Sequence, residues 1–164
     1  MLGWPNHVDL ATFSGGIWRA DPFGLANIGL HEITKVAWSD DITTASTQFQ
    51  VDFSSAKRVR VISEINHTAP EDALRRIKAG TTAGASDLYL GDWEDFHGIT
   101  YSEGGIEFGG WWGAGPTSPA SFVYGNPFIG VYVLPADVTA RYWSIEYDVT
   151  GSTLDHLQIG RLFM

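Results

Sequence analysis

A strict alternation of apolar and polar residues over residues 47–53 constrains this chain more than any other feature of its sequence. Phe49, Val51 and Phe53 fall on one face of an extended chain, and the residues between them are polar. A period of two is typical of a half-buried β-strand. Residues 58–65 carry a second alternation, after a short predicted turn at 54–57. We therefore expect two strands that are antiparallel neighbours.

The carboxyl-terminal part of the chain repeats this signal. Residues 128–134 are rich in β-branched and aromatic side chains and stop at Pro135, and residues 141–149 alternate again. Residues 157–164 end the chain inside a predicted core strand. The pattern indicates an all-β protein. The predicted core contains the following residues: Phe49, Val51, Val59, Val61, Val131, Val133, Trp143, Ile145 and Ile159.

Residues 70–80 are ambiguous when they are considered alone. Pro70 near the start, two acidic residues in the first turn and Gly80 at the end are typical of a helix. The residues from Ala73 to Ala79 also alternate in a way that fits a strand. In an all-β protein, pairing with neighbouring strands can override a weak local preference.

Composition limits the remaining possibilities. The chain has 164 residues with 44% hydrophobic residues, which fits one domain over residues 1–164. It has no cysteine, so disulfides and zinc–thiolate sites are excluded. A net charge of −9 disfavours nucleic acid and anionic membranes as partners. The first residues lack the pattern of a signal peptide, and no apolar run is long enough to span a membrane.

Two stretches of sequence resemble a known fold family. Residues 49–62 are similar to a signature strand of discoidin-type, galactose-binding-like β-sandwiches, and residues 140–146 with 159–163 are similar to their last strands. The chain also resembles small sandwich proteins of tailed-phage particles. This resemblance is carried by two stretches, Arg141-Tyr142-Trp143-Ser144-Ile145-Glu146 and Ile159-Gly160-Arg161-Leu162-Phe163. The resemblance implies a single jelly-roll-like antiparallel β-sandwich with long loops rich in glycine and aromatic residues. It also favours a strand from Ala73 to Ala79.

Residue types that support catalysis occur without a defined site. The carboxylates Asp92, Glu94, Asp95, Glu103 and Glu107 lie near aromatic residues, as in glycosidases, but solvated acids on the loops of an acidic protein explain them better.

The metal-ligating residue types show no site pattern either. The five histidines, His7, His31, His67, His97 and His156, lack the short spacing of a metal pair. Asp40 and Asp41 fit either a calcium site or an ordinary turn. We expect no catalytic residues, no metal and no cofactor, and therefore no enzyme.

The segment from Gly98 to Pro116 is the candidate binding surface. It combines many glycines with aromatic side chains, and neighbouring residues of an extended chain point in opposite directions. One of the two adjacent tryptophans can therefore project toward a sugar or a partner protein; alternatively, both rings cap the open end of the sandwich. The candidate binding residues are Tyr101, Phe108, Trp111 and Trp112.

The resemblance implies a non-enzymatic structural component of a tailed-phage virion, associated with the tail or its tip. It would act as an adaptor or as an adhesin that binds host-surface glycans, in several symmetric copies beside other virion subunits. Such a protein is made in the host cytoplasm and is found in the virion. The alternative is a stand-alone carbohydrate-binding module, and a glycoside hydrolase that uses the loop carboxylates is a third possibility.

Overall fold

A computed structural model describes residues 6–32, 34–70, 72–96 and 129–164. Extended segments dominate the described residues, as the sequence predicts. The elements are η1 (His7–Leu10), β1 (Thr12–Ser14), η2 (Leu25–Gly29), β2 (Ala37–Trp38), α1 (Thr44–Thr47), β3 (Phe49–Ile65), β4 (Leu74–Gly80), β5 (Tyr89–Leu90), β6 (Glu94–Asp95), β7 (Ile129–Asp148), β8 (Gln158–Ile159) and β9 (Arg161–Phe163). Among the residues that the structure describes, none of the helices is long and apolar enough to cross a membrane.

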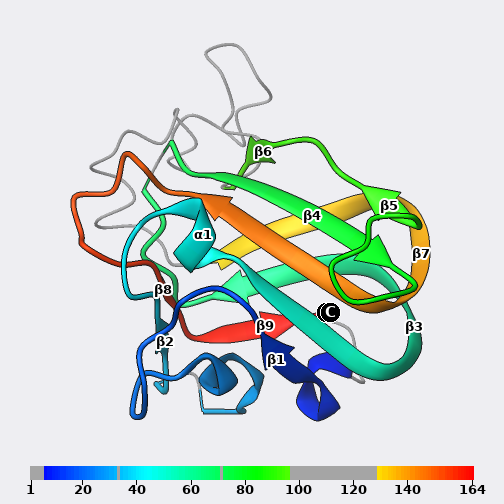
Figure 1. Ribbon diagram of the computed structural model, residues 1–164, viewed down its shortest axis with the longest axis horizontal. Helices are drawn as coiled ribbons and strands as arrows, with labels where there is room; N and C mark the ends of the chain where they lie inside the picture. Colours follow the sequence, from blue (N-terminus) through cyan, green and yellow to red (C-terminus); the bar gives the residue numbers. More distant parts are fainter. Residues whose placement is uncertain (1–5, 33, 71, 97–128) are drawn as a thin grey trace, which may run out of the picture.

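The two long strands β3 and β7 build the sandwich. They pair antiparallel along their length, from Phe49 opposite Ile145 to Ile65 opposite Ile129. Both double back at the same end of the molecule (Figure 1), so each contributes one half to each layer. The first layer adds β1 and β4, and the second adds β9. β2 and β8 pair separately beside the second layer.

The predicted turn at 54–57 is wrong, because residues 49–65 form one bent strand. The segments before and after the bend pair with β7 and not with each other. Ser54 adopts a positive φ of 64°, and its N–H is held by the Asp52 side chain at 2.7 Å. A register shift follows between Asp52 and Lys57. A bulge of this kind bends a strand without ending it. Residues 128–134 and 141–149 likewise fall mainly on the two halves of β7.

The core confirms six of the nine predicted residues and contradicts three. Phe49, Val51, Val59, Trp143, Ile145 and Ile159 are buried. Val61, Val131 and Val133 are instead 39%, 45% and 59% exposed. A register shift between Val59 and Val61 reverses the face that points inward, because a slip of one residue exchanges the two faces of a strand. The adjacent residues Ile62, Tyr132 and Leu134 are buried in their place.

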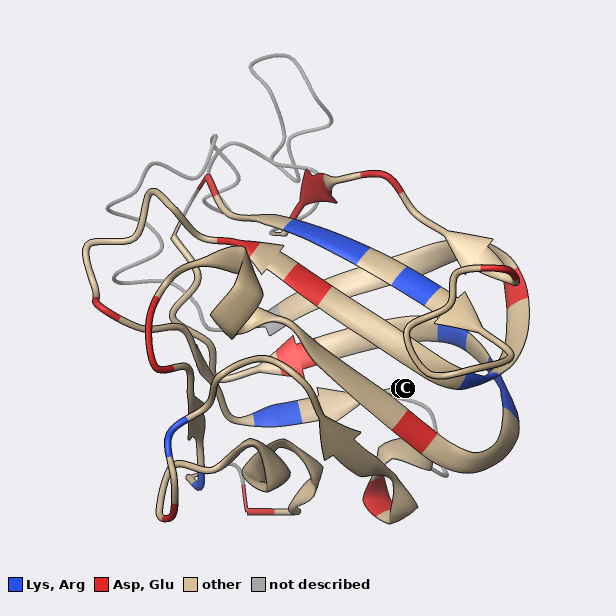
Figure 2. Ribbon diagram, viewed as in Figure 1, with Lys and Arg blue, Asp and Glu red and all other residues tan. Residues whose placement is uncertain are grey.

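The ambiguous segment is a strand, as the resemblance predicts. β4 pairs with β7 from Leu74 opposite Asp148 to Gly80 opposite Tyr142. Its inward residues Ile77 and Ala79 are buried. The continuous ladder with β7 overrides the helix-like ends of this segment. The basic positions of β4 lie beside an acidic position of β7 along the ladder, as the coloured ribbon of Figure 2 shows.

An ion pair is buried between the layers. The side chains of Glu64 and Arg75 are both fully buried, with Arg75 Nη1 2.5 Å from Glu64 Oε2. The Tyr147 hydroxyl donates to the other Glu64 oxygen at 3.0 Å. Phe96 and Tyr132 place their rings 5.0 and 5.1 Å from the Arg75 guanidinium carbon. Burial raises the pKa of Glu64 despite the nearby Arg75 charge.

The first and last residues that the structure describes are joined by hydrogen bonds. His7 donates its main-chain N–H to the carbonyl of Met164 at 3.1 Å, and Met164 donates to the Asn6 side chain at 3.0 Å. The buried Arg161 pairs with Asp9 and donates to the Gly29 carbonyl. The amino-terminal residues 6–10 are therefore fastened to the last strand.

Candidate functional site

The four predicted binding residues Tyr101, Phe108, Trp111 and Trp112 lie outside the described residues, as do Glu103, Glu107 and His97. Their role stays a prediction.

The described carboxylates of the predicted acidic group face outward. Asp92, Glu94 and Asp95 are exposed, and the last two form β6. Their main chain pairs with Arg75 and Leu74 of β4. The structure thus places two of these acids on a sheet edge and not in a loop.

The proposed calcium ligands take part in a turn. Asp41 accepts hydrogen bonds from the N–H and the hydroxyl of Thr43, at 2.8 and 2.7 Å, just before α1. These bonds lower the pKa of Asp41. Within the described ranges, no group of three or more potential metal ligands is found. Two histidines approach carboxylates: His31 lies 3.6 Å from Asp9, and His156 contacts Asp155.

An aromatic and charged cluster surrounds Trp38 of β2. The Phe23 ring stacks on Trp38 with a centroid separation of 3.7 Å and an interplanar angle of 2°. The His156 ring is 4.6 Å from Trp38, and the Arg19 guanidinium carbon is 5.4 Å from the centre of the indole. Three chain segments that are far apart in sequence thus meet at one indole. We call Arg19, Trp38, Asp155 and His156 the Trp38 cluster.

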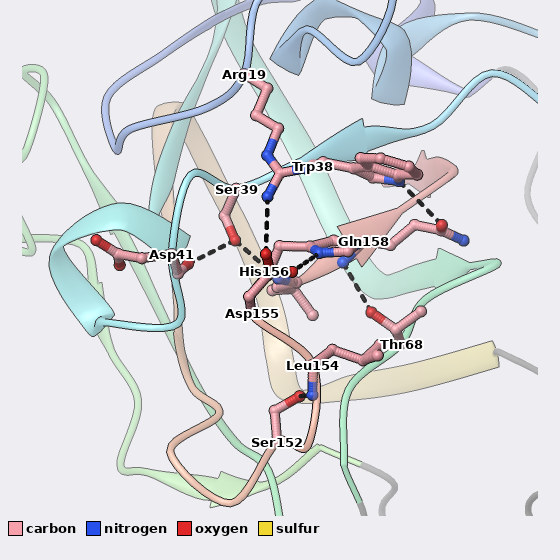
Figure 3. A network of polar contacts seen from close by, with 11 residues as sticks. Arg19, Trp38, Ser39, Asp41, Thr68, Ser152, Leu154, Asp155, His156 and Gln158 are labelled. Atoms are coloured by element: carbon pink, nitrogen blue, oxygen red, sulfur yellow. Dashed lines mark hydrogen bonds and ion pairs between the residues drawn. The ribbon is translucent and has the colours of Figure 1, made fainter.

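Asp155 carries the negative charge of this cluster. One carboxylate oxygen lies 2.5 Å from His156 Nδ1, and the other lies 3.4 Å from Arg19 Nη2 (Figure 3). The hydrogen bond with His156, with a smaller contribution from the Arg19 charge, lowers the pKa of Asp155. The Asp155 side chain is 79% exposed. An ionised carboxylate is therefore presented to solvent between two nitrogen groups.

Hydrogen bonds hold together the chain segments that carry the cluster. Trp38 Nε1 donates to the Gln158 side chain at 3.0 Å, and the main chain of Gln158 donates to the Thr68 hydroxyl at 2.9 Å. Ser39 accepts from the N–H of Leu157 and donates to the Asp41 carbonyl (Figure 3). These bonds tie the segments around residues 39, 68 and 157 together. The side chains of the cluster are consequently held in place before any ligand arrives.

The arrangement suits a ligand that has both an apolar face and several hydroxyls. Aromatic side chains contribute contact area, while charged groups form stronger hydrogen bonds than neutral ones. Sequence reasoning considered His156 only as a metal ligand and missed Arg19, Trp38 and Asp155. Their separation along the chain hides them, since Arg19 and Asp155 are 136 residues apart. The high tryptophan content was the available signal.

Comparisons with known proteins define the class of fold. No protein-family model and no curated protein sequence matches this chain. Among solved structures, it is similar to the family 32 carbohydrate-binding module of Clostridium perfringens NanJ in complex with galactose. The TM-score is 0.60, the identity is 10%, and the alignment covers 94% of this chain and 93% of the module. The chain thus has the discoidin-type, galactose-binding-like β-sandwich fold, and the expected fold class is confirmed.

Two other solved structures show the same likeness. The first is a chitosan-binding module in complex with chitotriose, from a Paenibacillus chitosanase/glucanase. It has a TM-score of 0.58 and 9% identity, over 96% of this chain and 97% of the module. The second is SpGH29, with a TM-score of 0.56 and 13% identity over 99% of this chain. This chain spans 28% of the length of SpGH29. At these identities the likeness concerns the fold alone.

Proposed function

We propose that this chain is a non-catalytic carbohydrate-binding module and that the Trp38 cluster is its sugar site. The observation that carries the proposal is the arrangement of one indole, one guanidinium, one imidazole and one ionised carboxylate on a fixed base. Structures with the same fold were solved with galactose and with chitotriose, which supports a saccharide as the ligand.

Each member of the cluster has a distinct role in this proposal. The aromatic surface around Trp38 supports the apolar face of a pyranose ring. Arg19 donates hydrogen bonds to sugar hydroxyls, and the exposed Asp155 carboxylate accepts them. His156 orients Asp155 through their 2.5 Å contact. Because these side chains are already fixed, little conformational entropy is lost when the sugar binds.

The carboxylate content of the cluster supports binding without catalysis. Hydrolysis of a glycosidic bond generally uses two carboxyl groups, one as the acid and one as the base or nucleophile. The Trp38 cluster contains a single carboxylate, Asp155. The cluster therefore lacks the second carboxyl group that hydrolysis of a glycosidic bond would use.

A role in a tailed-phage virion, as adaptor or glycan-binding adhesin, stays a prediction that rests on the sequence resemblance. The same applies to virion subunits as partners, to several symmetric copies and to a location in the particle. A sugar-binding site would serve an adhesin and a stand-alone module equally well. Detection of the chain in purified phage particles, by mass spectrometry, separates these two possibilities.

Calorimetric titration with galactose and with chitotriose tests the proposed site. We expect binding of at least one of the two sugars to the natural chain. Arg19→Gln and Asp155→Asn should each weaken it about tenfold or more, the loss of one or two charge-assisted hydrogen bonds.

The matched controls are Arg58→Gln and Asp137→Asn. Arg58 and Asp137 also form an exposed Arg–Asp pair, with a 3.6 Å separation, but at the bend of β3 and β7. These substitutions should leave the affinity unchanged. The site assignment fails if all four variants bind alike, and the function fails if the natural chain binds neither sugar.

A further inference from the structure

The outer face of β4 carries a charged group that is separate from the Trp38 cluster. Leu74, Arg76 and Lys78 point outward, since the residues that alternate with them are buried. Arg76 lies directly opposite Glu146 of β7 in the ladder. Arg76 Nε donates to Glu146 Oε2 at 2.7 Å, and Lys78 Nζ donates to Oε1 at 2.5 Å. Figure 2 shows these oppositely charged positions side by side on the two strands.

Trp93 lies against this group. Its ring centre is 4.6 Å from the guanidinium carbon of Arg76, a cation–π contact that fixes the orientation of the indole. Trp93 is nevertheless 36% exposed. Leu74 is also 36% exposed, and Leu90, opposite Lys78 on β5, is 61% exposed. An aromatic ring and two aliphatic side chains therefore surround the charged group at the surface.

The charged group retains hydrogen-bonding capacity. Lys78 has three N–H donors and uses one on Glu146; Arg76 has five and uses those of Nε and Nη2. Within the described part of the chain, the other donors of both residues have no protein partner. Glu146 offsets one of the two positive charges, and the exposed Asp95, which lies opposite the outward Leu74 in the ladder, adds a second negative charge to the same face. The face as a whole therefore favours an uncharged ligand that is rich in hydrogen-bond acceptors.

We propose that Trp93, Arg76 and Lys78 form a second saccharide-binding surface, which takes an uncharged sugar unit. This inference rests on the proposed function, which supplies the class of ligand. Arg76 occupies one face of the indole, so the sugar stacks on the remaining exposed part of the ring. The free donors of Arg76 and Lys78 then reach its hydroxyl oxygens. β4 and β6 lie at a distance from β2 and β8 in Figure 1, so the two surfaces bind separate sugar units.

Two-dimensional amide and indole NMR of the full chain tests this inference, with galactose as the uncharged sugar and with chitotriose, whose amino groups carry positive charge, for comparison. We expect shifts of the Trp93 indole N–H and of the Lys78 and Glu146 amides. Trp93→Ala should weaken this binding about tenfold, as for the loss of an aromatic contact residue, and Trp93→Phe should restore most of it. Leu88→Ala is the matched control, because Leu88 is 46% exposed and is tied to β4 through its main chain, which donates to the Ala79 carbonyl at 3.1 Å.

The Trp38 cluster provides the discriminating variant. If Asp155→Asn abolishes shifts around Trp38 and leaves those around Trp93, two surfaces exist and the inference is supported. If sugar shifts only the Trp38 cluster, or if Asp155→Asn removes both sets, the second surface is refuted while the proposed function stands. If neither sugar shifts any residue, the proposed function itself is refuted, and the second surface with it.

Discussion

Replacing Arg75 by methionine should destabilise the protein strongly at pH 7 and much less at pH 4. The substitution leaves the Glu64 carboxylate fully buried, with the Tyr147 hydroxyl as its remaining side-chain donor. Removing one partner of a buried ion pair costs about 3–5 kcal/mol. For a chain of this length, about 2–4 °C in melting temperature corresponds to each kcal/mol, so the melting temperature should fall by about 6–20 °C.

The pH dependence follows from the Glu64 carboxyl group. Its pKa is already raised by burial above the value of 4.5 expected in the unfolded chain, and loss of the Arg75 charge raises it further. An acid whose pKa is raised on folding binds its proton more tightly in the folded state. Stability therefore falls as the pH rises from about 4.5 through the folded pKa. At pH 4 Glu64 is protonated and neutral, so the loss should shrink to about 1–3 kcal/mol.

Urea unfolding of the natural chain and the variant at both pH values measures the effect. Adding Glu64→Gln to Arg75→Met should recover stability at pH 7, because it removes the unpaired charge. Arg58→Met is the control: Arg58 is 76% exposed, so its ion pair should contribute under about 1 kcal/mol. An equal loss at pH 4 and pH 7 would refute the reasoning.

Three further outcomes are expected. Gly16→Ala should lower the melting temperature, because Gly16 has a φ of +65° and an added Cβ would lie 2.1 Å from the Gln48 carbonyl oxygen. Gly24→Ala is the control and should be tolerated, because the atom nearest to its added Cβ is 3.8 Å away. NMR titration should place the pKa of Asp155 below 3.8, and His156→Ala should raise it toward that value; an unchanged pKa would contradict the contact. EDTA should leave thermal unfolding unchanged, and a marked drop in melting temperature would reveal an essential metal.

The strands were largely predictable because their alternation is local. In residues 49–53 and 141–149, the apolar side chains fall on one face of the strand, whichever strand pairs with it. The inward face after the bend was not predictable. Val61 and Val133 look like core residues, yet they lie opposite each other on the outer face. The bulge before Val61 is fixed by pairing with β7, which the sequence around it does not encode.

The candidate site was predictable only in kind. Aromatic residues in excess indicated a binding surface, but the tertiary fold alone brings Arg19 and Trp38 to Asp155. The loop that was favoured from sequence, with Trp111 and Trp112, lies outside the described residues. The segment from Ala73 to Ala79 shows the reverse case. Its local signals conflict, and only the likeness to related sandwiches indicated the strand that the structure contains.

The bond between His7 and Met164 has a consequence for how this chain folds during synthesis. A ribosome adds about 5–20 residues per second, so His7 waits roughly 8–30 s before Met164 is made. Until then β9 cannot pair with β3, and Arg161 cannot reach Asp9. The second layer therefore closes only after β9 has left the exit tunnel. A ribosomal pause before β9 is made would prolong the time for which the unpaired edge of β3 is open to misassembly.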